Sequence, residues 1–458
     1  MKNKEALHRE GDVNNSPSRM RWNHSLDQVS RETLWRDEAV FIRQSMSTPC
    51  LQTIVDADGC YLIDREGKRY LDFHGNSLHQ VGYKNPYVIE AITKQMSTLP
   101  FIPRRFTADI AMEAGERLVE KTISKDFKVL FVPSGSAAVG LALKIARKVT
   151  GNHKVISMWE SFHGAGLDAI SAGGESVFKN GIGPMLPGMI KVMSYQSYRN
   201  VFGASSPEDI AEKSLNYLEY VILNEGDISC ILLEPIRATD THIPPRSYFK
   251  RLRKICDEHG ILLIFDEIPT AFYRSGECYV HQLYDIEPDI LVLGKGLGGG
   301  IVPQAAVLVK KVLDTAAEVS LGHYTHEKPA IGSAAIVAML NYIDDYRLKE
   351  NSLSQSQFMA AKLKKLAEQY TCIGDLRICG LLITIELVKS RDTKEKDEQL
   401  TEFLLYYCLQ HGLSFKVAAG NCITWHPPLI IKEKEASLAI ELLENGLRAY
   451  QAKNPLII

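Results

Sequence analysis

Between about residue 106 and residue 330 the chain repeats one pattern of hydrophobic and polar positions. Short apolar runs are followed by turn residues and then by segments in which apolar residues recur at helical spacing. The runs predict strands at 128–134, 154–159, 229–236, 260–268, 289–295 and 305–310. Strands that alternate with helices are typical of a mostly parallel, doubly wound α/β sheet, which binds its ligands at the carboxyl ends of the strands.

The segments on either side of this region have a different pattern. A polar stretch leads into a helical pattern at about 25–46, and residues 61–73 predict a hairpin because β-rich runs flank turn residues. From about residue 335 the pattern is helix, strands and helix again. We therefore expect four parts: a polar arm (1–24), the first segment of a small domain (25–105), a large ligand-binding domain (106–334) and the remainder of the small α/β domain (335–458).

Composition and charge limit the classes of function. Lys and Arg number 53 against 55 Asp and Glu in 458 residues, so the chain lacks the basic excess typical of nucleic-acid-binding proteins. The nine cysteines form no C-x-x-C pair, which argues against a zinc site or a disulfide framework, and no metal is expected. The polar amino terminus and the lack of any long apolar segment predict a soluble, cytoplasmic protein that does not bind a membrane.

Four polar features follow predicted strands. Lys295 comes at the end of one apolar run and is followed at once by glycines, in LVLGKGLGGG. Residues 134–136 read SGS and open a helix, whose free N–H groups suit phosphate. Asp266 ends the run ILLIFDE, and Phe162 and His163 follow another strand. Taken singly, each has a plainer reading: a solvent-exposed lysine, a helix cap, a structural ion pair or core packing.

Together the four features match the needs of pyridoxal 5'-phosphate. Its aldehyde requires a lysine for the Schiff base, its ring nitrogen requires an acid, its ring is covered by an aromatic side chain, and its phosphate requires a cluster of N–H groups. The pattern therefore predicts pyridoxal phosphate as the cofactor.

The stretches FDEIPTAFYRSG and GKGLGGG resemble two motifs of the class III aminotransferases, which are fold type I pyridoxal-phosphate enzymes. The resemblance runs from about residue 50 to the end. It implies that Lys295 forms the Schiff base, that Asp266 meets the pyridine nitrogen and that Ile268 packs under the ring. The other residues that it places at the cofactor are Gly135, Ser136, Phe162, His163, Glu234 and Thr325.

In this family the segment that resembles HYTHEKPAIGSAA reaches the cofactor phosphate of the neighbouring subunit, here through Thr325. The resemblance therefore implies an obligate homodimer, or a higher oligomer, with shared active sites.

Two departures from the family pattern concern the reaction. Many members hold the substrate carboxylate with an Arg where this chain has Thr424, and neutralise that Arg with a Glu where it has Thr239. An aminotransferase must bind two substrates in turn, one of them usually an amino or keto acid. Loss of both residues suggests that no second substrate is required.

New arginines occur at other positions, namely Arg104, Arg105 and Arg237. Two converging guanidinium groups would bind a dianion such as a phosphonate. The combination resembles the branch of the family that removes ammonia from (R)-1-hydroxy-2-aminoethylphosphonate. Hydroxide leaves poorly, so this reaction requires a general acid, for which His79 is the candidate. The alternatives are a surface role for Arg104 and Arg105, a structural pairing of Arg237 with Glu234, and a merely hydrogen-bonded His79.

The leading hypothesis is thus a lyase that expels hydroxide from this aminophosphonate and yields phosphonoacetaldehyde and ammonia, as a step in phosphonate catabolism. An ω-aminotransferase acting on an amine or an ω-amino acid is the second hypothesis. A regulatory or scaffold protein that binds the cofactor without turnover is the third, and the intact Lys295 and Asp266 argue against it.

Overall fold

The computed structural model describes residues 16–44 and 50–453, so most of the predicted polar arm lies outside the described residues. The chain divides into two compact units. Unit 1 comprises 1–75, 82–84 and 350–458, and unit 2 comprises 76–81 and 85–349. Three stretches differ from the predicted division, namely 76–81, 85–105 and 335–349, all of which belong to unit 2. In unit 2, α3 (Pro86–Thr98) packs along α10 (Ala330–Asp345).

Unit 2 is built on a seven-stranded sheet with the order β4-β10-β9-β8-β7-β5-β6. Only β10 runs antiparallel to its neighbours, which confirms the mostly parallel α/β fold. Six strands lie where the hydrophobic pattern predicts them, whereas β6 was not predicted because it is only half-buried. The strands are β4 (Phe127–Val132), β5 (Lys154–Met158), β6 (Met189–Val192), β7 (Ile228–Leu233), β8 (Leu262–Asp266), β9 (Ile290–Leu293) and β10 (Ala305–Lys310).

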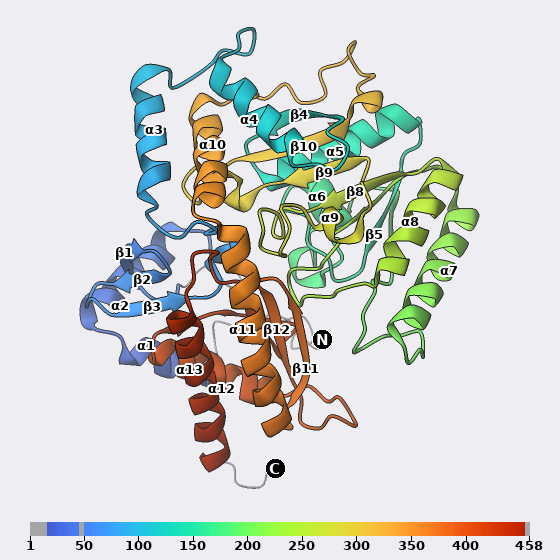
Figure 1. The fold of residues 1–458 in the computed structure, drawn as a ribbon. Coiled ribbons are helices and arrows are strands. Elements are labelled where there is room, and N and C mark those ends of the chain that lie inside the picture. Colours follow the sequence, from blue (N-terminus) through green and yellow to red (C-terminus); the bar gives the residue numbers. More distant parts are fainter. Residues whose placement is uncertain (1–15, 45–49, 454–458) are drawn as a thin grey trace. The chain divides into compact units, whose positions relative to one another are not determined.

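Helices pack against this sheet and against one another (Figure 1). Helix α5 (Gly135–Thr150) packs on the strands from β4 to β7, and its apolar residues join Val132, Leu232 and Val292 in a hydrophobic cluster. Burying such side chains stabilises the unit by roughly 25 cal/mol per Å² of apolar surface. The remaining helices of unit 2 are α4 (Asp109–Glu120), α6 (Leu167–Ala172), α7 (Pro207–Glu225), α8 (Arg246–His259) and α9 (Val280–Tyr284).

Unit 1 contains two four-stranded sheets, with the orders β1-β2-β3-β13 and β11-β12-β15-β14. The hairpin expected at 61–73 is confirmed by β2 and β3. The strands of unit 1 are β1 (Ile54–Asp58), β2 (Tyr61–Asp64), β3 (Arg69–Asp72), β11 (Ile373–Cys379), β12 (Leu382–Leu387), β13 (Leu413–Ser414), β14 (Lys416–Ala418) and β15 (Cys422–Trp425). Its helices are α1 (Pro17–Ser25), α2 (Gln28–Val40), α11 (Leu348–Gln369), α12 (Glu398–Gln410) and α13 (Glu433–Lys453).

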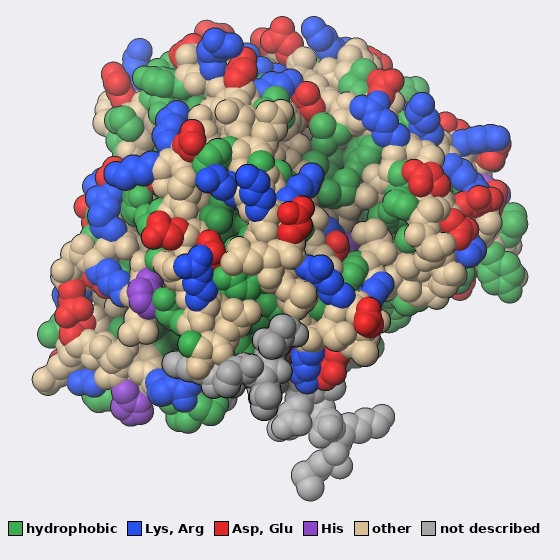
Figure 2. Space-filling model, turned by 60° about the horizontal axis from the view of Figure 1, so that its bottom comes forward, with side chains coloured by type: hydrophobic (Ala, Val, Ile, Leu, Met, Phe, Trp, Pro, Cys, Tyr) green, Lys and Arg blue, Asp and Glu red, His purple; other side chains and the backbone are tan. Residues whose placement is uncertain are grey.

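Basic and acidic side chains are interspersed over the face shown in Figure 2, as the balanced charge of the sequence leads one to expect. Within the described ranges, every helix is too short or too polar to cross a membrane.

Candidate active site

Lys295 begins a short 3-10 turn (Lys295–Gly298) directly after β9, and its φ of 48° is unusual for a residue with a side chain. The glycines that follow are required by close packing. A β-carbon on Gly296 would lie 2.0 Å from Oε1 of Gln80, and one on Gly299 would lie 2.7 Å from Val88. The glycine-rich sequence therefore lets the reactive-lysine turn approach two neighbouring segments of unit 2.

Asp266 ends β8 and is 2% exposed. Its Oδ1 accepts a hydrogen bond from the N–H of Ile268 at 3.1 Å, and its Oδ2 lies 2.8 Å from Nδ1 of His163. A buried carboxylate needs such partners to remain charged. The other ring nitrogen, Nε2 of His163, has no hydrogen-bond partner among the described residues. The structure thus brings together an acid and a histidine that lie 103 residues apart.

Ile268 lies between the two loops that flank the expected cofactor ring. A β-carbon on Gly135 would be 2.7 Å from its Cδ1, and one on Gly294 would be 3.3 Å from its Cγ2. The ends of β4, β8 and β9 therefore meet around a single apolar side chain. This is the position in which a residue can support a flat ring from below.

The amino-terminal end of α5 has the features of a phosphate-binding loop. Ser134 caps the helix, because its Oγ accepts a hydrogen bond from the N–H of Ala137 at 3.2 Å. Ser136 Oγ accepts one from the N–H of Ala165 at 2.8 Å, which ties this loop to the loop that carries Phe162 and His163. A helix of this length presents free N–H groups and a positive dipole end at residues 135 and 136.

Glu234 joins two loops at the end of β7. Its Oε1 accepts a hydrogen bond from the N–H of Phe162 at 3.5 Å, and its Oε2 accepts one from the N–H of Ala238 at 3.1 Å. Burial raises the pKa of this carboxyl. The ring of Phe162 is 39% exposed and lies 4.5 Å from that of Phe178, so it remains accessible for stacking. The lysine, the buried acid, the helix end and the exposed ring together fit pyridoxal phosphate.

Arg237 is bound to two carboxylates, neither of which is Glu234. Its Nε donates to Asp240 Oδ1 at 2.6 Å, its Nη2 donates to the other oxygen of Asp240, and its Nη1 donates to Glu160 Oε2 at 3.1 Å. Burial by itself would lower the pKa of Arg237, but the two carboxylates outweigh burial and raise it. The alternative of a structural pairing for Arg237 is thus found with Asp240 and Glu160, not with Glu234.

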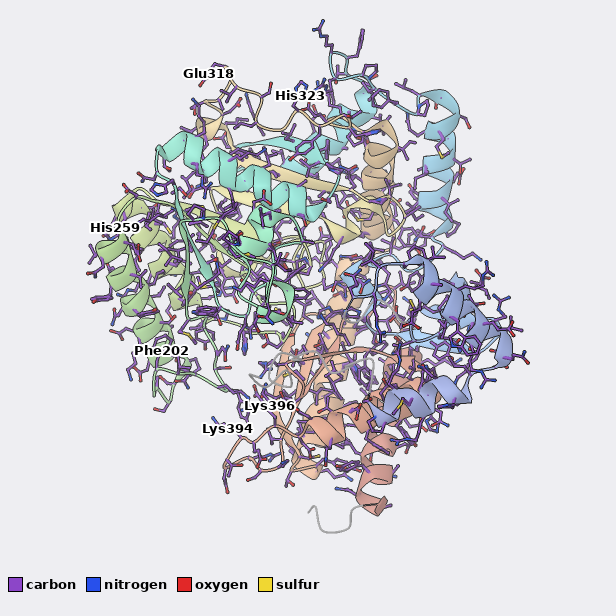
Figure 3. All side chains as sticks on the ribbon, turned by 180° about the vertical axis from the view of Figure 1, so that it is seen from behind. Phe202, His259, Glu318, His323, Lys394 and Lys396 are labelled. Carbon is purple, nitrogen blue, oxygen red and sulfur yellow. The ribbon has the colours of Figure 1, made fainter. Side chains whose placement is uncertain are left out.

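The other predicted substrate residues lie in exposed loops. Arg104 and Arg105 are exposed, and Arg104 Nη1 lies 3.5 Å from the carbonyl oxygen of His323. Figure 3 labels His323 on the connection between β10 and α10, and the exposed Thr325 follows two residues later. The structure thus brings the arginine loop to the Thr325 segment.

His79 is fully buried beside the Lys295 turn, since a β-carbon on Gly300 would lie 3.9 Å from its Cα. Sequence reasoning missed Gln80, although it belongs to the same stretch HGNSLHQVGY. It also missed Glu160 and Asp240. A sequence signal existed only for Asp240, three residues from Arg237, because Glu160 is 77 residues away from that arginine.

Thr424 belongs to unit 1, where it pairs with Thr384 on β12 and with Lys416 on β14. Residues that are directly opposite on antiparallel strands share a face of the sheet, so Lys416 and Thr424 are neighbours. All the other residues of the candidate site belong to unit 2.

Comparison with known proteins gives one family match and several full-length relatives. Residues 42–447 match the family model "Aminotransferase class-III". The chain is 46% identical over 452 residues to an (R)-1-hydroxy-2-aminoethylphosphonate ammonia-lyase from Vibrio splendidus, with 96% of this chain and 94% of the relative covered. It is 28% identical to an alanine/serine racemase from Pyrococcus horikoshii, with 85% and 84% covered.

Among solved structures, the taurine:2-oxoglutarate aminotransferase of Bifidobacterium kashiwanohense, in complex with PLP and glutamate, superposes with a TM-score of 0.87. The two are 25% identical, and the match covers 94% of this chain and 100% of that one. The fold is therefore that of fold type I enzymes. Because a lyase, a racemase and an aminotransferase all resemble this chain, the fold alone does not determine the reaction.

Proposed function

Because the chain belongs to the class III aminotransferase family, we propose that it is a pyridoxal-phosphate-dependent lyase that releases ammonia from (R)-1-hydroxy-2-aminoethylphosphonate. The observation that carries this proposal is the likeness, over nearly the whole chain, to the ammonia-lyase of Vibrio splendidus. The replacement of both halves of an amino-acid-binding pair by Thr424 and Thr239 supports it, because a lyase needs no second substrate.

Residues of unit 2 would hold the cofactor. The amine of Lys295 would bond to it covalently, the Asp266 carboxylate would hold its ring nitrogen protonated, and the first residues of α5, Gly135 and Ser136, would bind its phosphate. Phe162 would cover one face of the ring. When bound, pyridoxal phosphate would supply an electron-accepting ring for the electron pair that remains when the carbon next to the substrate nitrogen loses a proton.

In this scheme the side chains of the protein move protons. The amine of Lys295 would remove a proton from the carbon that bears the substrate nitrogen. Hydroxide is a poor leaving group, so an acid must protonate it as the bond to the adjacent carbon breaks, and we assign this to His79. The unsaturated amine that is released takes up one water and gives phosphonoacetaldehyde and ammonia. One water is lost and one is gained, so the atoms balance.

We assign the phosphonate to the arginines. Arg104 and Arg105 are exposed and carry no carboxylate partner among the ion pairs of the described residues. For Arg237 to take part, the phosphonate must replace one of its carboxylates. Glu160 is the expected one, because its side chain is 39% exposed whereas that of Asp240 is 9% exposed. A dianion in that place would restore a charge-assisted contact.

We further propose that the enzyme is a homodimer in which Thr325 reaches the cofactor phosphate of the partner subunit. A groove beside this segment supports the proposal, because it is lined by apolar residues of α4 and β4, among them Met112 and Phe131, together with Glu327 and Lys328. Analytical ultracentrifugation tests the dimer, and a monomer with full activity would refute it. The cytoplasmic location stays a prediction.

The decisive experiment supplies the enzyme, its cofactor and (R)-1-hydroxy-2-aminoethylphosphonate without any keto acid. The lyase should release ammonia and aldehyde in equal amounts over many turnovers. An aminotransferase would stop after one turnover per active site and resume only when a keto acid is added. That second outcome would favour the aminotransferase hypothesis, which is supported by the structural similarity to the taurine:2-oxoglutarate aminotransferase.

A further inference from the structure

The side-chain amide of Gln80 is buried beside the Lys295 turn, and its hydrogen-bonding groups are unused by the part of the chain that the structure describes. Gln80 is 1% exposed. Among the described residues, neither its Oε1 nor its Nε2 has a hydrogen-bond partner. Burying an amide in this way costs free energy unless a water, an ion or a ligand supplies the partner.

Packing fixes the amide close to the reactive lysine. A β-carbon on Gly296 would lie 2.0 Å from Oε1 of Gln80 and 2.5 Å from Nε2, so the amide covers the Cα of the residue that follows Lys295. Leu78, from the same segment, lies against Gly300. The position of the amide is thus set by van der Waals contact, while both polar ends lack a hydrogen-bond partner among the described residues.

We propose that Gln80 binds the hydroxyl group that leaves from the substrate. This inference rests on the proposed function. A primary amide offers two N–H donors and one carbonyl acceptor, and a hydroxyl group can both accept and donate, so the two are complementary. A phosphonate dianion offers only acceptors and is better bound by arginines. The hydroxyl sits on the carbon next to the one at which Lys295 acts.

Gln80 thereby determines specificity for a hydroxylated aminophosphonate. Its N–H would hold the departing oxygen, and its carbonyl would orient the hydroxyl hydrogen. The neighbouring His79 remains the assigned proton donor. The amide is uncharged, so it contributes to the orientation of the hydroxyl and leaves recognition of the dianion to the arginines.

The test compares Gln80→Met with the wild-type holoenzyme. Methionine keeps the length and packing of the side chain but removes both hydrogen-bonding groups, so the turn should stay in place. Two ligands are compared: (R)-1-hydroxy-2-aminoethylphosphonate, followed as kcat/KM for ammonia release, and 2-aminoethylphosphonate, which lacks the hydroxyl, followed as an inhibition constant. The dissociation constant of pyridoxal phosphate serves as the structural readout.

We expect Gln80→Met to lower kcat/KM for the hydroxylated substrate by roughly tenfold or more, as for the loss of a buried hydrogen bond in the transition state. The inhibition constant of 2-aminoethylphosphonate and the cofactor dissociation constant should stay within about twofold of wild type, because neither ligand group contacts the amide.

An equal loss for both ligands would overturn the inference and make Gln80 a support of the turn only. Unchanged kcat/KM would overturn it as well. If the wild-type enzyme releases no ammonia, the lyase function fails separately. In that case the dissociation constants of the two ligands, measured from the visible absorbance of the bound cofactor, still decide the role of Gln80.

Discussion

Replacing Arg237 with Gln removes the guanidinium group that donates two hydrogen bonds to the buried Asp240 carboxylate. The side chains of Arg237 and Asp240 are 8% and 9% exposed. Breaking a buried ion pair from one side costs about 3 to 5 kcal/mol, because the remaining charge is left without compensation. We therefore expect Arg237→Gln to lower the free energy of unfolding by about that amount.

The chain offers a matched control. Arg251 donates to Glu219 at 3.3 Å, and both side chains are 33% exposed. Such a pair contributes only about 0 to 1 kcal/mol, so the free energy of unfolding of Arg251→Gln should be close to that of the wild type. The double variant Arg237→Gln/Asp240→Asn should recover much of the loss, because no buried charge is left unpaired. Denaturant unfolding of the four cofactor-loaded proteins measures this. Equal stability of Arg237→Gln and wild type would refute the assignment.

The same double variant distinguishes a structural role of Arg237 from a role in substrate binding. If Arg237 also holds the phosphonate, a charge-assisted contact worth about 1.5 to 3 kcal/mol is lost, which corresponds to a decrease in kcat/KM of roughly tenfold to 150-fold. Cofactor affinity should stay unchanged, because the phosphate of the cofactor is assigned to Gly135 and Ser136. A stable double variant with wild-type kcat/KM would show that Arg104 and Arg105 bind the dianion without Arg237.

Four further predictions concern single residues of unit 2 and their ionisation. Lys295→Ala should lose the covalent bond to the cofactor, so the visible absorbance should disappear on dialysis, and a variant that keeps both colour and turnover would contradict the assignment. Asp266→Asn should keep the fold but slow ammonia release, because the ring nitrogen would no longer be held protonated, and wild-type rates would exclude this role. Burial by itself would raise the pKa of Asp240, but Arg237 outweighs burial and holds that pKa well below its usual value. The pair therefore adds stability above about pH 4 that is lost as the pH falls through the lowered pKa, so wild type and the double variant should converge in acid. Burial, followed by the nearby Lys179, lowers the pKa of Lys191 to about 7. The unfolded chain binds this proton more tightly, so Lys191→Met should raise the melting temperature more at pH 7 than near pH 10, and an equal effect at both would argue against the lowered pKa.

Local sequence was sufficient for the parts of the protein that depend on short-range patterns. The runs that form β5, β7, β8, β9 and β10 are apolar and largely buried, and the run that forms β4 is partly buried. Each is bounded by turn residues, so the existence and order of these strands could be predicted from the sequence. Lys295 and Asp266 could be recognised from the sequence because a charged residue at the end of a buried strand needs a compensating partner or a functional role. Strand β6 was missed because half-burial leaves a mixed pattern.

Only the tertiary structure decided which distant side chains meet. Glu160 reaches Arg237 across 77 residues, and His163 reaches Asp266 across 103, since parallel strands bring their carboxyl ends to one edge of the sheet whatever their separation in the chain. The buried amide of Gln80 gave no sequence signal, because its meaning depends on what packs against it. Hydrophobic periodicity specifies which residues are buried, whereas the partners of buried polar groups are set by packing in three dimensions.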